Sequence, residues 1–220
     1  MFPLFFDPTF VLLVPAVILA FWAQMKVRSA YSQYSRVLSR RGVTGAEAAR
    51  ALLDRFGMTG VPIQRVAGNL TDHYDPRDKT LHLSEGVYNS SSIAAIGVAA
   101  HEVGHAIQHQ ENYAPLKFRN AVVPAVGIGS SLAFPLFFLG LLFRGSILMD
   151  VGILLFVGVI VFHLVTLPVE FDASSRALRL LGNTGMLASD EVQGAKVVLN
   201  AAALTYVAAY DIAFEEGFNS

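Results

Sequence analysis

The chain has 220 residues, of which 54% are hydrophobic and 15% are charged, and its mean hydropathy is +0.50. This composition is too apolar for an ordinary soluble domain and indicates an integral membrane protein in contact with the lipid bilayer. The formal net charge of −1 gives no indication of nucleic-acid binding. Because the chain has no cysteine, disulfides and thiolate metal sites are excluded, and any bound metal must have nitrogen and oxygen ligands.

Three apolar stretches are long enough to cross a bilayer, which takes about 20 residues in a helix. The first runs from about Pro8 to Ala23 and predicts an uncleaved anchor over residues 1 to 25, since no basic residue precedes it and no clear cleavage site follows. The second and third cover residues 121 to 143 and 147 to 167. Only three residues separate them, which predicts a transmembrane helical hairpin over residues 121 to 167.

The basic residues predict the orientation of these spans. Lysines and arginines follow the first span, precede the second and follow the third, whereas the hairpin tip carries Arg144 alone. Residues 26 to 120 and 168 to 220 are therefore expected on the cytoplasmic side. The N-terminus and the hairpin tip are expected on the outside.

The segment from residue 26 to 120 has the pattern of a compact soluble part. Thr44 and Glu47 fit a capping box, apolar residues then recur at helical spacing, and Gly57 marks the end of this helix. We interpret it as a packing helix without a catalytic role. The stretches 61 to 66 and 69 to 84 predict short strands, and the turn formers in "YDPRDK" predict a β-hairpin.

The next predicted helix, which Ser91 or Ser92 can cap, leads into "GVAAHEVGHAIQHQ", residues 97 to 110. His101 and His105 are four residues apart, so on a helix their imidazoles lie on one face and can chelate a single ion. Glu102 projects from the neighbouring face, where it can reach a reacting water without being a ligand. This is the H-E-x-x-H arrangement of zinc peptidases.

Three further features of this stretch bear on the metal hypothesis. Ionisable side chains among alanine and valine are costly to bury unless a metal compensates them; the alternative is a solvated helix with surface histidines. Gly104 adds no bulk, which would allow another element to approach closely. His109 lies on the same face, but about 12 Å from His101 along a continuous helix. We therefore interpret it as a polar face residue rather than the third ligand.

A third ligand is required, because a catalytic zinc has three protein ligands and one open position. The segment "LPVEFDASSRALRLLG" predicts a helix that begins at Pro168 and ends at Gly182, with Glu170 in its first turn. The returning hairpin can bring Glu170 to the paired histidines, so we predict ligation, with capping of the helix dipole as the alternative. For Asp172 we favour an ion pair with Arg176, four residues later.

Four segments carry a family resemblance: "LTDHYDP", "LSEGVYNSSSIAAIGVAAHEVGHAIQH", "VEFDASSRAL" and "VLNAAALTYVAA". They resemble the neutral zinc metallopeptidases of the bacterial YugP-like type, small membrane proteases, over about residues 26 to 209. The resemblance implies a gluzincin-like site. In it, Zn²⁺ is bound by two histidines and a glutamate, and Glu102 acts as the catalytic acid and base; the implied ligands are His101, His105 and Glu170.

The chain departs from related membrane zinc proteases in two places. Those proteases have an aspartate four residues after the ligand glutamate, where this chain has Ser174, so Asp172 is considered as a substitute partner of the histidines. At the C-terminus the chain turns acidic instead of continuing as an apolar stretch. Residues 190 to 214 are therefore predicted to form a packing helix on the cytoplasmic side or at the interface rather than a fourth span.

Substrate and auxiliary residues follow from the same reasoning. An extended peptide is expected along one strand of the hairpin over residues 61 to 83, where the candidate contacts are Asn69, Leu70 and Thr71. His73 and His82 are interpreted as plain strand residues. His163, near the end of the third span and on roughly the same helix face as Glu170, is either an auxiliary functional residue or a helix-end histidine bonded to a neighbour.

The sequence thus predicts a mainly α integral membrane protein with about three transmembrane helices and a zincin-like domain that contains a small β-hairpin or sheet and the H-E-x-x-H helix. The predicted function is that of a zinc-dependent endopeptidase of the bacterial inner membrane, which hydrolyses membrane or misfolded proteins near the cytoplasmic face. The alternative is an inactive zinc-binding membrane scaffold or regulator. The presence of Glu102 argues against it, because a purely structural site needs no base beside an open coordination position.

Overall fold

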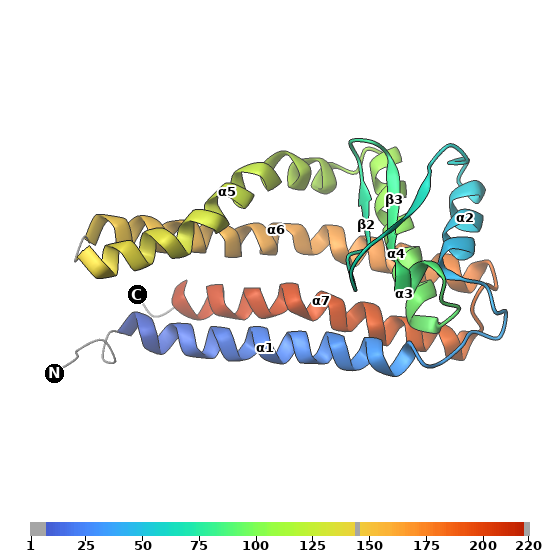
Figure 1. Ribbon diagram of the computed structural model, residues 1–220, viewed down its shortest axis with the longest axis horizontal. Helices are drawn as coiled ribbons and strands as arrows, with labels where there is room; N and C mark the ends of the chain where they lie inside the picture. The colour runs from blue at the N-terminus through green and yellow to red at the C-terminus, as the bar shows by residue number, and fades with distance from the viewer. Residues whose placement is uncertain (1–7, 144–145, 218–220) are drawn as a thin grey trace. The chain divides into compact units, whose positions relative to one another are not determined.

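The computed structural model describes residues 8 to 143 and 146 to 217 (Figure 1). Its elements are mainly helical with one small three-stranded sheet, as predicted. The chain divides into two compact units, and each is described by itself. One unit comprises the described residues of Met1–Trp22, Ala114–Pro168 and Thr205–Ser220, and the other comprises Ala23–Tyr113 and Val169–Leu204.

Helix α2, Gly45–Arg55, belongs to the second unit and begins with the predicted capping box. The Glu47 backbone N–H donates to the Thr44 hydroxyl, and the Thr44 backbone N–H donates to the Glu47 carboxylate. Gly57 lies beyond its C-terminal end at a φ of 70°, a left-handed conformation that glycine adopts without strain. The sequence prediction for this helix is confirmed at both ends.

The sheet consists of strands β1, Ile63–Val66, β2, His73–Asp75, and β3, Thr80–Ser84, in the order β1-β3-β2 (Figure 1). Strands β2 and β3 form the predicted antiparallel hairpin. Strand β1 pairs with β3 in parallel, an arrangement that the sequence pattern did not indicate. Strand β2 is thus an edge strand, with one side free of β pairing within the described sheet.

Helix α4, Ile93–Gln110, forms the centre of the second unit. Ser92 caps it by accepting a hydrogen bond from the Ala95 backbone N–H, as predicted. Helices α2 and α3, Glu85–Tyr88, and strands β2 and β3 all pack against it. Its apolar side chains are buried in one core with residues of these elements and of the later helices, among them Leu52, Leu53, Leu81, Val103, Ala177 and Leu181.

Helix α6, Ser146–Asn183, corrects one prediction. The sequence reading placed the end of a span at residue 167 and a new helix at Pro168, but the helix continues through Pro168. The missing N–H and the steric clash of a proline inside a helix cost about 3 kcal/mol; the complete burial of Val169 and Ala173, which follow Pro168 in the helix, acts against that cost. The helix also ends at Asn183, not Gly182, and Gly185 adopts a φ of 62° after it.

Parts of two more helices belong to the second unit. These helices are α1, Pro8–Tyr34, and α7, Ser189–Gly217. Small residues allow α7 to pack closely, since a Cβ built on Gly194 would lie 2.7 Å from the Tyr34 ring. Glu191, in the first turn of α7, accepts hydrogen bonds from the backbone N–H groups of Arg40 and Ala188.

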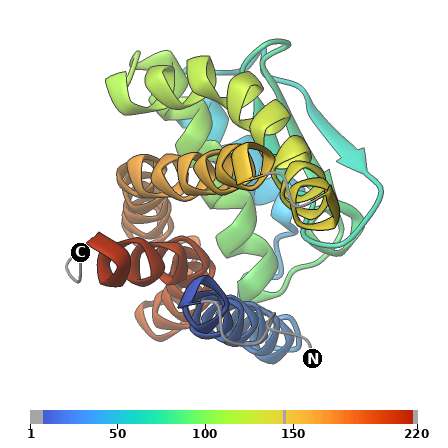
Figure 2. The same cartoon turned by 90° about the vertical axis from the view of Figure 1, so that its left-hand side faces the viewer.

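In the first unit, α5, Ala114–Phe143, and the N-terminal part of α6 lie side by side. A Cβ on Gly152 would lie 2.9 Å from the Ala133 carbonyl oxygen, so the two backbones are in close contact there. Figure 2 views this pair from the end at which α5 stops and α6 begins. The two helices of the predicted hairpin therefore pack against each other, and their crossing of a membrane stays a prediction.

Among the residues that the structure describes, one helix, Ala114–Phe143, is long and apolar enough to cross a membrane. Its most apolar window has a mean hydropathy of 2.0 and is only 11% buried. The prediction of about three transmembrane helices is thus not supported. The described apolar part of α6, Ile147–Val159, is shorter than a membrane-spanning helix. Most side chains of the first predicted span are not among those that the structure describes.

Candidate metal centre

The two histidines of the H-E-x-x-H motif lie on one face of α4, as their spacing predicts. The ring centroids of His101 and His105 are 4.7 Å apart and the rings are nearly perpendicular. The His105 side chain is buried and that of His101 is largely covered. Helical periodicity alone therefore brings two imidazoles into range of one ion.

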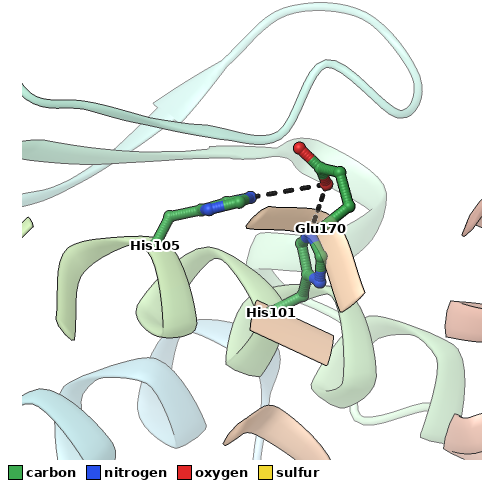
Figure 3. A group of neighbouring side chains, drawn as sticks. All are labelled: His101, His105 and Glu170. Carbon is green, nitrogen blue, oxygen red and sulfur yellow. Dashed lines mark hydrogen bonds and ion pairs between the residues drawn. The ribbon is translucent and has the colours of Figure 1, made fainter. Parts of the chain in front are cut away.

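Glu170 projects from α6 towards both imidazoles (Figure 3). Its Oε2 atom lies 3.3 Å from His101 Nε2 and 3.6 Å from His105 Nε2. The possible donor atoms of the three side chains all lie within 4.8 Å of one another, in an arrangement able to hold a metal ion. The structure thus brings together the three residues that the sequence predicted as ligands.

Close packing of α6 on α4 makes this convergence possible. A Cβ added to Gly104 would lie 2.7 Å from the Ala173 carbonyl oxygen and 3.1 Å from its Cα, so only glycine allows the two backbones to approach this far. Val169 and Ala173, which flank Glu170 along α6, are fully buried. The lack of bulk at Gly104 therefore determines the position of Glu170.

The electrostatics of the site favour a bound cation. Burial alone would raise the pKa of Glu170, but the hydrogen bonds and charges of His101 and His105 outweigh it and lower the pKa well below its usual range. The Glu170 carboxylate is therefore ionised although only 6% of the residue is exposed. A buried carboxylate that faces two ring nitrogens needs a positive charge to compensate its desolvation.

The two donor separations that involve Glu170 match zinc. Imidazole nitrogens and carboxylate oxygens bind Zn²⁺ at about 2.0 to 2.2 Å, and a tetrahedral arrangement then separates neighbouring donors by about 3.3 to 3.6 Å. The two distances from Glu170 Oε2 to the histidine nitrogens are 3.3 and 3.6 Å. The donor set of two histidines and one glutamate is also found in catalytic zinc sites. The residues present therefore fit this metal.

Glu102 lies beside this group, buried and held by the edge of the sheet. The Tyr74 backbone N–H donates a hydrogen bond to Glu102 Oε2 at 3.1 Å. Asp72 holds the chain just before β2 by accepting hydrogen bonds from the backbone N–H and the hydroxyl of Ser84. The carboxylate next to the metal group is thus anchored to strand β2.

Each histidine has a partner for its Nδ1 atom. Ser174 Oγ lies 3.1 Å from His101 Nδ1, and Gln108 Oε1 lies 2.9 Å from His105 Nδ1. Asp172, considered above as a direct partner of the histidines, instead accepts a hydrogen bond from Gln108. Its predicted ion pair with Arg176 is confirmed.

The other residues singled out from the sequence lie elsewhere. The substrate candidates were expected in a strand but form an exposed bend before β2; they are Asn69, Leu70 and Thr71. His73 and His82 are a cross-strand pair with stacked rings. His109 Nδ1 lies 3.0 Å from the Tyr74 hydroxyl, and the side chain of His163 is outside the described residues.

The sequence did not lead to Gln108 as a contact of the metal centre. Ser174 was named only because related membrane zinc proteases have an aspartate at its position. Local spacing contained a signal for both. Gln108 follows His105 by three residues and Ser174 follows Glu170 by four, so each shares a helix face with a predicted ligand. The interaction of Tyr74 had no such signal, because a backbone N–H is present at every residue except proline.

Two imidazoles and a carboxylate that could hold a metal ion, together with the further buried carboxylate of Glu102 on the same helix, are typical of a metal-dependent hydrolase. Residues 9–216 match the sequence profile of the family described as "Putative neutral zinc metallopeptidase". The chain is also 51% identical over 199 residues to "Putative membrane protease YugP" of Bacillus subtilis (strain 168), covering 90% of this chain and 88% of that protein. No solved structure matches the chain significantly.

The chain therefore belongs to the family of neutral zinc metallopeptidases. It is a hydrolase whose cofactor is zinc, and the group of His101, His105 and Glu170 provides a place for that metal. Membership of a peptidase family makes peptides or proteins its class of substrate.

Proposed function

We propose that this chain is an endopeptidase of the bacterial inner membrane that hydrolyses membrane or misfolded proteins near the cytoplasmic face. In this proposal His101, His105 and Glu170 bind zinc and Glu102 is the catalytic acid and base. The observation that carries the proposal is the convergence of Glu170 Oε2 on both ring nitrogens, at 3.3 and 3.6 Å.

Zinc, when bound, lowers the pKa of water and polarises the scissile carbonyl group. The buried carboxylate of Glu102 accepts a proton from the attacking water as the water oxygen bonds to the carbonyl carbon. Glu102 then donates this proton to the amide nitrogen as the C–N bond breaks, which releases an amine and a carboxylic acid; the acid then loses its proton to the amine. A positioned acid and base of this kind contributes about 10²- to 10⁴-fold to the rate.

The edge of β2 offers a place for the substrate backbone. An extended peptide pairs with an exposed strand edge through main-chain hydrogen bonds, which make little demand on sequence. Tyr74 lies on this edge and its N–H already points to Glu102. We therefore assign substrate pairing to the edge around Tyr74, with the exposed bend at Asn69, Leu70 and Thr71 as a flanking contact.

Membrane insertion is supported by the surface of α5. Apolar side chains on the core helix of a soluble protein are buried, yet Phe134, Phe138 and Leu142 are all more than half exposed. The Bacillus subtilis relative is itself named a membrane protease. The positions of the lysines and arginines favour a cytoplasmic site, with the start of α6 on the outside.

Zinc analysis and cleavage assays test the site. Purified full-length protein in detergent is compared with Glu170→Ala and Glu102→Gln, with unfolded casein and a membrane protein as substrates. We expect zinc in the wild type and in Glu102→Gln, loss of zinc in Glu170→Ala, and cleavage by the wild type alone. Zinc binding without cleavage of any substrate by the wild type would favour the scaffold alternative.

The orientation is tested by single-cysteine labelling, which is simple here because the chain has no cysteine. A membrane-impermeant maleimide is applied to intact spheroplasts carrying Ser146→Cys or Ser189→Cys. We expect labelling of Ser146→Cys before lysis and of Ser189→Cys only after it. The reverse pattern would place the site outside the cell.

A further inference from the structure

We infer that Gln108 is a positioning residue of the metal centre, which holds His105 in the orientation and tautomer that ligation requires. The inference rests on the proposed function, since it assigns a role toward the same metal ligand. Gln108 is fully buried beside His105 on α4, and its side-chain amide makes three hydrogen bonds.

The neighbours of the amide determine which way it points. Gln108 Nε2 donates to the Val169 carbonyl oxygen at 2.9 Å and to Asp172 Oδ2 at 2.8 Å. The Val169 oxygen can only accept, and Asp172 Oδ2 also accepts a hydrogen bond from Arg176 Nε, so the NH₂ group must face them. The amide oxygen consequently faces His105 Nδ1, which lies 2.9 Å away.

The direction of the amide determines the tautomer of His105. An amide oxygen can only accept, so His105 Nδ1 carries the proton and donates. In the neutral ring the lone pair is then on Nε2, the nitrogen 3.6 Å from Glu170 Oε2. Gln108 thus prepares His105 to be a ligand at Nε2.

Asp172 and Arg176 hold the amide in this direction from the other helix. Arg176 Nε donates to the same Asp172 oxygen at 2.6 Å, and Arg176 Nη1 donates to Glu111 at the C-terminal end of α4, also at 2.6 Å. The hydrogen bonds therefore start at His105 on α4, cross to α6 and return to α4. This series of hydrogen bonds gives Asp172 a role that does not involve direct contact with the zinc.

The experiment compares Gln108→Met, Asp172→Ala and Asp172→Asn in the full-length protein. Methionine has a similar length but no amide, alanine removes the acceptor for Gln108, and asparagine retains a carbonyl oxygen that can accept from both Gln108 and Arg176. Ile107→Val, a buried neighbour on α4 that loses one methyl group, is the matched control for packing. The readouts are zinc affinity by competition with a chromogenic chelator, the visible spectrum of the Co²⁺-loaded protein and thermal unfolding without metal.

We expect Gln108→Met to weaken zinc binding by about 10- to 100-fold and to alter the Co²⁺ spectrum, while the metal-free protein unfolds near the temperature of Ile107→Val. Asp172→Ala should change zinc affinity in the same direction and Asp172→Asn should restore it. Zinc affinity of Gln108→Met within twofold of wild type would overturn the inference. If Gln108→Met does not fold, equal zinc affinities of the two Asp172 variants would overturn it.

The same assay separates this inference from the proposed function. If His105→Ala binds zinc as well as the wild type, or the wild type binds none, both are wrong. If His105→Ala loses zinc but Gln108→Met and Asp172→Ala do not, the ligand assignment survives and only the positioning role fails.

Discussion

The Tyr74 backbone N–H donates to Glu102 Oε2 at 3.1 Å, so the edge of strand β2 and the carboxylate beside the metal group share one hydrogen bond. Tyr74 is paired with Leu81 of β3 on the other side of the strand. In the proposed function, a peptide that pairs with the free side of β2 would meet this N–H and the Glu102 carboxylate together. Under this proposal, substrate binding and the position of Glu102 would be linked through a single donor.

Tyr74→Pro tests this link, because proline lacks the N–H and is tolerated at a strand edge. A hydrogen bond to a charged group contributes about 1.5 to 3 kcal/mol, so we expect kcat/KM to fall about 10-fold or more with the zinc content unchanged. Tyr74→Phe, which removes only the hydroxyl near His109, is the control. Equal activities of the two variants would show that the N–H has no role.

Gly104→Ala is expected to disrupt the metal centre through packing. Its Cβ would meet backbone atoms of Ala173, which cannot move without displacing α6, so we expect a loss of about 1 to 3 kcal/mol in the free energy of unfolding and weaker zinc binding. Gly97→Ala on the same helix is the matched control, because its nearest neighbour would be the Ala195 Cβ at 3.3 Å and the Ala195 backbone atoms lie no closer than 3.7 Å. Denaturant unfolding and chelator competition measure both effects. Unchanged zinc affinity in Gly104→Ala would contradict the role of the close approach.

Asp72 should make stability depend on pH. Burial raises its pKa, with a smaller contribution from Glu102, against the lowering effect of the hydrogen bonds from Ser84. Between the unfolded pKa of about 3.9 and the raised folded value, the folded state binds more protons, so stability falls as the pH rises through this window. Asp72→Asn keeps an acceptor but cannot ionise. We expect its stability relative to wild type to increase from pH 4 upward, measured by denaturant unfolding; a difference independent of pH would refute the assignment.

Removal of zinc should lower the thermal stability of the protein. A ligand at about 1,000 times its Kd stabilises the folded state by about 4.1 kcal/mol, and this contribution is lost on chelation and regained when zinc is returned. Glu102→Gln should respond as the wild type does, because Glu102 is not among the proposed ligands. Glu170→Ala should unfold at the same temperature with and without zinc. A zinc-dependent shift in that variant would mean that another residue completes the site.

Local patterns predicted the parts of this protein that depend on neighbours in the sequence. The capping box of Thr44 and Glu47, the cap at Ser92 and the shared face of His101 and His105 all involve residues three or four positions apart. Helical geometry alone determines such relationships. The choice of Glu170 needed one more argument, namely that a catalytic zinc requires a third ligand.

The sequence by itself therefore determined the helical character, the hairpin β2-β3 and the identity of the residues that can hold a metal. Only the tertiary structure decided that α6 continues through Pro168, that β1 pairs in parallel with β3, and that Gln108 connects His105 to Asp172. These features depend on burial and on hydrogen bonds between positions far apart in the chain. Such contacts produce no periodic pattern in the sequence, because they form and stabilise the protein only after the helices have packed.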